Sequence, residues 1–202
     1  MQKRKIRDYI RLVGAVLFFW FYIPHMIIYV LWKKEIVNSD ILWLKKQVNI
    51  SLPNWMAVLY FLHNNGYYRS LFYYRIGPVL SLLIGWYRPR NQFFIIPYST
   101  RLGSGVLFAH PYSTILNAES IGNNFSCIHC TTLGKKNGAR PIIGDNVSLG
   151  CNVTILGGIH IGNNVTVGAG SVVVKDVPDN CIVAGNPAKI IRFKNENTCI
   201  NQ

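Results

Sequence analysis

A six-residue period in the second half of the chain restricts the possible folds more than any other sequence feature. From residue 143 the chain reads IGDNVS, LGCNVT, ILGGIH, IGNNVT, VGAGSV and VVKDVP, and an aliphatic residue opens every unit. Helices repeat every 3.6 residues and half-buried strands every two, so neither explains this period. A β-solenoid of short strands and corners does, with three hexapeptides in each coil. Glycine and asparagine after the aliphatic residue suit corners with unusual backbone angles.

The period also extends towards the N-terminus, with two interruptions. Ten residues separate Leu133 from Ile143, so four residues are expected to bulge out around GKKNGARP. One further residue is inserted between Phe108 and Ile121. We therefore predict a mainly β fold, with a parallel β-helix over residues 95–193 and a short tail over 194–202.

The first half of the chain is more basic and more apolar. Residues 1–100 hold 13 Lys or Arg against 3 Asp or Glu, a net charge of +10, whereas residues 101–202 hold 8 against 5, a net charge of +3. Positive charge among aromatic and aliphatic residues favours an anionic membrane surface or a phosphate-bearing lipid. No recognised nucleic-acid motif accompanies it, so nucleic acid is not expected as a partner.

The apolar segment 12–32 is long enough to cross a ~30 Å hydrocarbon layer as a helix. Pro24 interrupts it, and basic residues flank both ends, which does not fit a single crossing under the positive-inside rule. A broken helix that enters the membrane and returns to the same side explains both features. A true span and a buried helical hairpin are the alternatives. Residues 1–94 are thus predicted to form a helical, membrane-anchoring region in which His25 has no functional role.

Residues 51–90 are predicted to form short helices separated at Pro53, Gly66, Gly77–Pro78 and Pro89. Tyrosines alternate with arginines in GYYRSLFYYRIG and WYRPR. This pattern is typical of an amphipathic surface at a lipid interface. A cradle for a lipid-linked phosphate is the alternative.

Five cysteines, an odd number without regular pairing, indicate free thiols in a reducing compartment. The segment CIHC (127–130) is half of a zinc motif, and no second CxxC follows it. We therefore expect no metal site.

The repeat resembles a known family. IGDNVSLGCNVTILGGIHIGNNVTVGAGSVVVKDVPDNCIVAGNPAKII is similar to the left-handed β-helix of the hexapeptide-repeat acyltransferases, particularly the serine O-acetyltransferases and their relatives that act on saccharides. The resemblance covers residues 95–193. It implies a homotrimer, acetyl-CoA as the donor in a groove between neighbouring protomers, and a histidine base.

His110, in FAHPYST (108–114), occupies the place of the family's catalytic histidine. Residues one coil apart lie side by side, so the repeat and its two insertions predict a column along the solenoid axis. Its members are His110, His129, Cys151 and Ala169.

Three interpretations of His110 and His129 are open. As a general base, His110 would take a proton from an attacking hydroxyl and return it near neutral pH. As metal ligands, the pair would resemble the carbonic anhydrases built on the same solenoid, but their third histidine and His-x4-His spacing are missing. Both histidines are otherwise corner residues of a non-catalytic solenoid. We expect His110 to be the base and His129 to support it or contact the substrate.

The bulging loop differs from that of the serine enzymes, where an Arg-His-Pro step contacts the amino acid. Here GARP puts Ala139 and Arg140 in those places, which leaves Arg140 as a candidate substrate contact. The carboxylate that pairs with the base is also absent, since its equivalent falls near Ile95. Glu119 or a group of the neighbouring protomer is therefore expected to orient His110. The helical N-terminal domain of the serine enzymes is expected to be replaced by the membrane-like region.

The end of the repeat resembles the family's cofactor groove, in GAGSVVVKDVP and VAGNPAKIIRFK. Small residues allow the extended pantetheine to approach the backbone, and Lys or Arg suit the phosphates. The expected acetyl-CoA contacts are Gly134, Cys151, Gly168, Ala169, Lys175, Pro187, Lys189 and Arg192.

We therefore predict an O-acetyltransferase that moves acetyl from acetyl-CoA to a hydroxyl of a saccharide, for example a lipid-linked capsule, exopolysaccharide or O-antigen intermediate. Its expected place is the bacterial cytoplasmic membrane, with the catalytic domain on the cytoplasmic side. The main alternative is a serine O-acetyltransferase of cysteine biosynthesis. A γ-type carbonic anhydrase and a non-catalytic solenoid are further alternatives.

Overall fold

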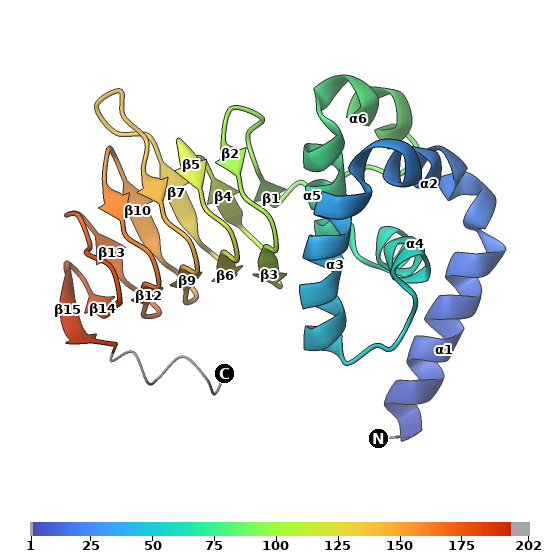
Figure 1. Cartoon of the computed structure of the whole chain (residues 1–202), viewed down its shortest axis with the longest axis horizontal. Coiled ribbons are helices and arrows are strands. Elements are labelled where there is room, and N and C mark those ends of the chain that lie inside the picture. Colours follow the sequence, from blue (N-terminus) through green and yellow to red (C-terminus); the bar gives the residue numbers. More distant parts are fainter. Residues whose placement is uncertain (1, 195–202) are drawn as a thin grey trace. The chain divides into compact units, whose positions relative to one another are not determined.

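The computed structural model describes residues 2–194, except the side chains of residues 2–5, 7 and 8, and it divides the chain into two units (Figure 1). The first unit is Met1–Asn91 and the second is Gln92–Gln202. The sequence placed the boundary after residue 94; in the structure Phe94 and Ile95 already form the first strand of the second unit. Apart from Lys194, the predicted tail lies outside the described residues.

The second unit is a parallel β-solenoid with three sheets (Figure 1). One sheet contains β1 (Phe94–Ile95), β4 (Thr114–Leu116), β7 (Thr132–Gly134), β10 (Thr154–Leu156) and β13 (Val172–Val173). Another contains β2 (Arg101–Leu102), β5 (Ser120–Ile121), β8 (Ile142–Ile143) and β11 (His160–Ile161). The third contains β3 (Leu107–Ala109), β6 (Ser126–Ile128), β9 (Ser148–Leu149), β12 (Thr166–Val167), β14 (Cys181–Gly185) and β15 (Ala188–Phe193). The solenoid predicted from the period of six is thus confirmed, and β15 alone of these strands runs antiparallel to its neighbour, β14.

The strand registers confirm both predicted insertions. Leu149 pairs with Val167, exactly three hexapeptides later, as in a coil without insertions. Phe108 pairs with Cys127, one position beyond that regular spacing, which accounts for the single inserted residue. Cys127 pairs with Leu149, four positions beyond it, which accounts for the bulge. The bulging loop lies between β7 and β8, where an antiparallel bridge between Lys136 and Ala139 closes it.

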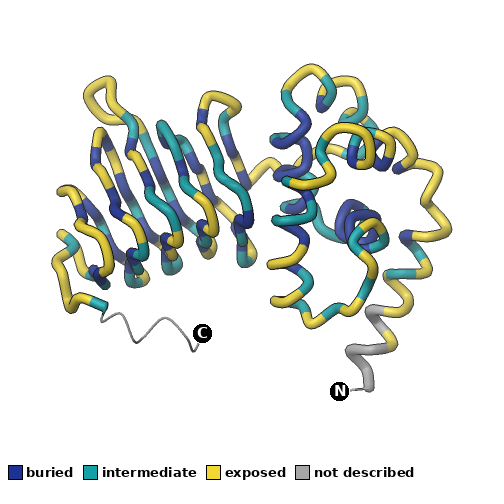
Figure 2. The backbone as a smooth tube through the Cα atoms, viewed as in Figure 1, coloured by how far each residue is buried: buried dark blue, intermediate teal, exposed yellow. Residues whose placement is uncertain are grey.

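The residue that opens each hexapeptide is buried, and Figure 2 shows buried segments recurring along the coils. Ile143, Leu149, Ile155, Ile161, Val167 and Val173 are each at most 2% exposed. At the corners, asparagines adopt left-handed φ angles of 55–57°, which this residue tolerates better than most. The corner asparagines are also linked between coils, since Asn124 donates a side-chain hydrogen bond to Asn146 and Asn164 donates one to Asn180.

Close approach of successive coils requires glycine at some corners. A Cβ on Gly150 would lie 2.6 Å from the backbone nitrogen of Ala169 in the next coil. A Cβ on Gly134 would also meet an atom at 2.6 Å, but that atom is Cδ2 of the Leu156 side chain, which can rotate away. The two glycines therefore differ in what limits their replacement.

We expect Gly150→Ala to destabilise the protein by about 1–3 kcal/mol, because the backbone of the next coil must shift. Gly134→Ala should cost less, because only the Leu156 side chain has to move. Thermal unfolding followed by circular dichroism measures both. Equal losses for the two variants would contradict the argument from backbone contact.

The first unit is helical, and its later boundaries follow the sequence signals. It contains α1 (Gln2–Leu17), η1 (Phe19–Tyr22), α2 (Ile23–Ile28), η2 (Tyr29–Lys33), α3 (Lys34–Val48), α4 (Asn54–Asn64), α5 (Gly66–Ile76) and α6 (Pro78–Gly85). Pro53 caps α4, Gly66 opens α5 after Asn65 has capped it, and Pro78 opens α6 after Gly77. The predicted helix breaks at these positions are confirmed.

The apolar segment 12–32 is bent, and the position of the bend differs from the prediction. Of the described helices, none taken singly is long and apolar enough to cross a membrane; Tyr9–Leu17 and Phe19–Val48 meet the criterion only as a pair bent by 73°. The break falls at Phe18, and Pro24 instead occupies the first turn of α2. A proline is tolerated there because the first turn leaves its N–H groups without helical partners in any case.

His25 is fully buried against α5, and its Nε2 lies 3.0 Å from the hydroxyl oxygen of Tyr73. That hydroxyl donates its own proton to the carbonyl of Arg88, so Nε2 is the donor to Tyr73. Burial lowers the pKa of His25 to about 4, and the positive charge of Arg69 adds to the effect. The imidazole is therefore neutral in the folded protein at neutral pH.

This burial predicts an acid-sensitive fold. The unfolded chain titrates His25 near its ordinary pKa and binds more protons than the folded chain between pH 6.5 and 4, so the free energy of unfolding falls as pH falls through that window. The loss should reach about 3 kcal/mol at pH 4 and vanish above pH 7. His25→Gln should flatten the pH dependence of thermal unfolding, whereas the exposed His160→Gln should not. An unchanged slope in the first variant would refute the assignment.

Candidate active site

His110 lies directly after β3, at an exposed corner with an irregular backbone. Its φ is +49° and that of Ser113 is +51°. The Tyr112 N–H donates to the carbonyl of His110 at 2.6 Å, and the Cys130 N–H of the next coil donates to the carbonyl of Tyr112 at 2.8 Å. At the equivalent position one coil later, the Asn152 N–H donates to the carbonyl of the column residue His129 at 3.0 Å. By the same rule the Cys130 N–H would donate to His110, but it donates to Tyr112 instead. The inserted residue therefore widens this one corner.

The predicted column is confirmed by the strand registers. Ala109 pairs with Ile128, which places His110 beside His129. Continuing the registers of the next two strand pairs, β6 with β9 and β9 with β12, places His129 beside Cys151 and Cys151 beside Ala169. The pairing of β12 with β14 places Gly185 next. The two histidines are exposed, so the column follows one accessible corner of the solenoid.

The far end of the column is built from small residues. Gly168 is required by the fold, because a Cβ there would lie 2.8 Å from Cβ of Ala184. Ala169 is exposed, and a Cβ on Gly170 would meet nothing within 4 Å. The corner is thus open at Ala169 and Gly170, where an extended ligand has room beside the backbone.

Glu119, one of the two expected partners of His110, is bonded to two arginines in the described chain. The Glu119 carboxylate accepts hydrogen bonds from Arg140 at 2.7 Å and from Arg101 at 3.3 Å. Glu119 directly precedes β5, which lies in a different sheet from β3. Its two arginine partners belong to the β5 sheet, since Arg101 lies on β2 and Arg140 shortly precedes β8. Arg140 is held further by Ser99 Oγ at 2.9 Å.

The position expected to lack the family's carboxylate holds apolar residues. Ile95 is partly exposed on β1, and its neighbour Phe94 is buried and packs edge-to-face on Phe108, with ring centroids 4.8 Å apart. This part of the protomer therefore supplies no acidic partner for His110.

A groove of about 880 Å³ lies at a second corner, beneath the bulging loop. Its lining includes Lys136, Ala139, Leu156, Gly158, Val174 and Lys175. The sequence analysis identified Lys175 but missed Lys136, Leu156 and Gly158. The insertion at residues 134–141 was the sequence signal for these residues. A loop that bulges out of a solenoid lies over the coils that follow, and a groove forms between the two.

The predicted cofactor contacts thus fall into separate groups in one protomer. Cys151, Gly168, Ala169 and Pro187 lie along or beside the histidine column. Gly134 ends β7 and Lys175 lines the groove, both at the other corner. Lys189 and Arg192 are exposed on β15. In the part of the chain that is described, no three His, Cys, Asp or Glu residues gather in a way that would hold a metal ion.

Comparison with known proteins supports this description. The family model for the bacterial transferase hexapeptide (six repeats) matches residues 140–175. Serine acetyltransferase 2 of Arabidopsis thaliana is 47% identical over 103 residues, which cover 48% of this chain and 32% of the relative. The putative colanic acid biosynthesis acetyltransferase WcaB of Escherichia coli strain K12 is 43% identical over 99 residues, which cover 47% of this chain and 61% of the relative. The matched segment therefore spans less than two thirds of these curated relatives.

Solved structures extend the similarity beyond the solenoid. Serine acetyltransferase from Brucella abortus strain S19 superimposes with a TM-score of 0.62 at 27% identity and covers 80% of this chain and 69% of its own. The serine acetyltransferase of Neisseria gonorrhoeae gives 0.56 at 30% identity and covers 81% and 68%. Since the second unit is little more than half of the chain, part of the helical unit is matched too. The expectation that a different region replaces the helical domain of the serine enzymes is therefore wrong for that part.

Fold and site together define a hexapeptide-repeat β-solenoid protein with an accessible histidine column. The chain belongs to the hexapeptide-repeat transferase family, and it is similar to the serine acetyltransferases within that family. These comparisons support the serine alternative better than the saccharide interpretation.

The strand registers also predict the relative reactivity of a thiol in the column and a thiol in the solenoid interior. Cys127 is buried, and burial raises the pKa of its thiol, whereas Cys151 is partly exposed in the column. We expect iodoacetamide to modify Cys151 at least about tenfold faster than Cys127, because the thiolate is the reacting form and must be accessible. Mass spectrometry of the native protein measures this, with denatured protein as the control. Equal rates in the native protein would contradict the register.

Proposed function

We propose that this chain is an acetyl-CoA-dependent O-acetyltransferase with His110 as general base. The observation that carries the proposal is the accessible column, which has exposed histidines at one end and an open corner at Ala169 and Gly170 at the other. Its length along the solenoid suits an extended donor. A solved serine acetyltransferase from Brucella abortus, 25% identical to this chain with a TM-score of 0.60, is a complex with coenzyme A.

His110 has the properties that the reaction requires. A histidine side chain can accept a proton at one ring nitrogen and later return it. It would accept the proton of the acceptor hydroxyl as that oxygen attacks the thioester carbonyl carbon, and then return the proton to the departing sulfur. Acetyl-CoA supplies the acetyl thioester. Backbone N–H groups of the corner would stabilise the developing oxyanion.

The separation of the two groups of residues in one protomer supports a homotrimer as part of this proposal. The histidine column and the groove beneath the bulging loop occupy different corners of one protomer. A neighbouring copy would set its groove and its Lys175 opposite the column. Such an arrangement would also provide the partner that orients His110, which the described chain does not provide itself.

L-Serine is the acceptor that the similarity favours, because a relative 47% identical over 103 residues and the superimposed structures are serine acetyltransferases. A saccharide hydroxyl is the second candidate, and a specific observation supports it. Arg140, one of three cations in the bulging loop, is paired with Glu119 at 2.7 Å, which makes it less available to bind an amino-acid carboxylate. The 43% identity with a putative colanic acid biosynthesis acetyltransferase points in the same direction.

The test is thiol release from acetyl-CoA by the purified full chain, with L-serine or with lipid-linked glycans extracted from bacterial membranes as acceptor. We expect His110→Ala to lower turnover by about 10²–10⁴-fold, because it removes the general base. His160→Ala is the matched control: it is also an exposed histidine, but it lies on β11 in another sheet. Its turnover should stay within about twofold of the unsubstituted protein.

Protection of Cys151 from iodoacetamide by coenzyme A gives a separate readout of donor binding along the column. Serine-dependent release would make L-serine the acceptor, and glycan-dependent release without serine turnover would favour the saccharide. Full activity of His110→Ala would eliminate it as the base. Absence of both turnover and Cys151 protection would refute the proposed function.

A further inference from the structure

Helix α1 turns an apolar face away from the rest of its unit. Ile6, Ile10, Val13 and Leu17 are spaced by four, three and four residues, so they share one face, and all are exposed. The opposite side packs on α4, where Ala15 is fully buried. In a water-soluble domain the apolar stripe of a helix faces the core, so this orientation is reversed.

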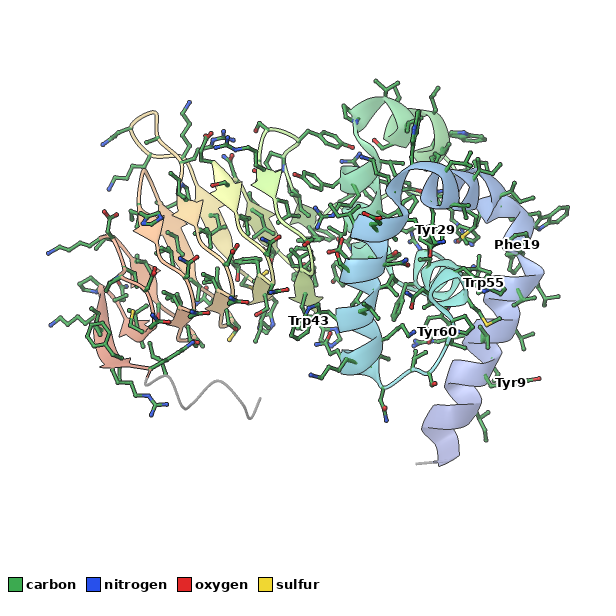
Figure 3. The ribbon with its side chains drawn as sticks, viewed as in Figure 1. Tyr9, Phe19, Tyr29, Trp43, Trp55 and Tyr60 are labelled. Atoms are coloured by element: carbon green, nitrogen blue, oxygen red, sulfur yellow. The ribbon has the colours of Figure 1, made fainter. Side chains whose placement is uncertain are left out.

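The exposed apolar face continues through the bent segment that follows. The side chains in residues 18–32 that are 40–75% exposed are Phe18, Phe19, Trp20, Phe21, Ile23, Ile27, Val30, Leu31 and Trp32. They alternate with buried Tyr22, His25 and Tyr29, which hold the inner side of the segment. Figure 3 shows Tyr9 and Phe19 projecting outward from the unit, whereas Tyr29 lies inside it. Only one side of residues 18–32 is therefore free.

Helix α6 adds a second row of exposed residues beside the first. Val79, Leu82, Leu83 and Trp86 are 64–79% exposed. The following residue, Tyr87, donates a hydrogen bond to the carbonyl of Phe21, and the two rings lie 6.2 Å apart. We call the combined set the apolar surface; its members are Ile6, Tyr9, Ile10, Val13, Leu17, Phe19, Trp20, Ile23, Ile27, Leu31, Trp32, Val79, Leu82, Leu83 and Trp86.

Positive charge borders the apolar surface. No Asp or Glu occurs between Asp8 and Glu35, or between residues 66 and 90. The other acidic residue of the unit, Asp40, is buried in an ion pair with Arg75 at 2.9 Å. Residues 1–100 carry a net charge of +10, and Glu35 is the one acidic side chain that is exposed among those described in this unit. A second copy of the chain would bring like charges together, whereas an anionic surface would neutralise them.

We propose that the apolar surface docks on an anionic phospholipid bilayer. Its composition is that of an interfacial element, with aliphatic residues at the centre, three tryptophans, and Lys or Arg at the margin. The partly exposed free thiols Cys130 and Cys151 suit a reducing compartment, which places the surface on the cytoplasmic face of a membrane. The inference does not depend on the acetyl-transfer reaction.

The internal contacts favour a unit that lies on the bilayer over a segment that crosses it. A crossing or re-entrant segment would have to leave the contact between His25 and Tyr73 and expose the buried side chains of Tyr22 and Tyr29. Docking keeps these contacts and covers only the side that is already exposed. The expected depth is about 5–10 Å, at the boundary of headgroups and acyl chains.

The experiment is flotation of the full chain with vesicles of phosphatidylcholine alone or mixed with phosphatidylglycerol. We expect binding to the mixed vesicles that weakens at high salt. Leu31→Glu, and separately Leu82→Glu with Leu83→Glu, should each lower the bound fraction about tenfold by placing charge against acyl chains. Leu42→Glu is the matched control, because Leu42 is an exposed leucine of the same unit outside the apolar surface. Circular dichroism confirms that each variant is folded.

Each outcome decides the proposal. Wild-type flotation by both surface variants, or no flotation by the unsubstituted chain, would overturn it. Equal loss in the Leu42→Glu control would show that added negative charge alone is sufficient, and would also overturn it. A smaller oligomer for Leu31→Glu without lipid would identify a second copy as the occupant instead. His110→Ala should float like the unsubstituted chain, so membrane binding and acetyl transfer are tested independently.

Discussion

Hydrogen bonding between successive coils fixes the position of every candidate residue in the second unit. Strands in successive coils are hydrogen-bonded in a fixed register. The position of a residue is therefore found by counting residues from its partner in the adjacent coil. This requires the backbones to approach closely at the corners, and glycine at Gly150 and Gly168 permits it. The histidine column follows from that geometry. Its two histidines are adjacent in space because one coil with a single insertion separates them along the chain.

This is why so much of the second unit could be predicted from the sequence. The period of six determines the fold, and the two breaks in the period locate the insertions. The pairing of Phe108 with Cys127 and of Cys127 with Leu149 then follows by arithmetic. Partners of individual side chains could not be obtained in this way. The ion pair of Glu119 with Arg140 depends on how far the bulging loop folds back, and spacing along the chain carries no information about that.

The helical unit illustrates the opposite case. Helix boundaries followed from Pro53, Gly66 and Pro78, which act on the local backbone. The hydropathy of residues 12–32 did not reveal that one side of the segment is buried, because a contact such as that of His25 with Tyr73 joins residues 48 positions apart. Nor did it reveal that α6 adjoins the same segment through Tyr87. An apolar run in the sequence therefore reveals only which residue types the segment contains. Tertiary contacts decide which side of the segment is buried and which side faces solvent or lipid.

The last strand of the solenoid has a consequence for how the protein behaves in solution. A stack of parallel coils ends in strands with unpaired N–H and C=O groups, and such edges recruit further strands from other chains. Here β15 turns back against β14 and occupies that edge with antiparallel hydrogen bonds. Its outward side chains include Lys189 and Arg192, whose charges discourage another strand from adding. β15 thereby covers the end of one of the three sheets, and it presents a charged edge to any strand of another chain there.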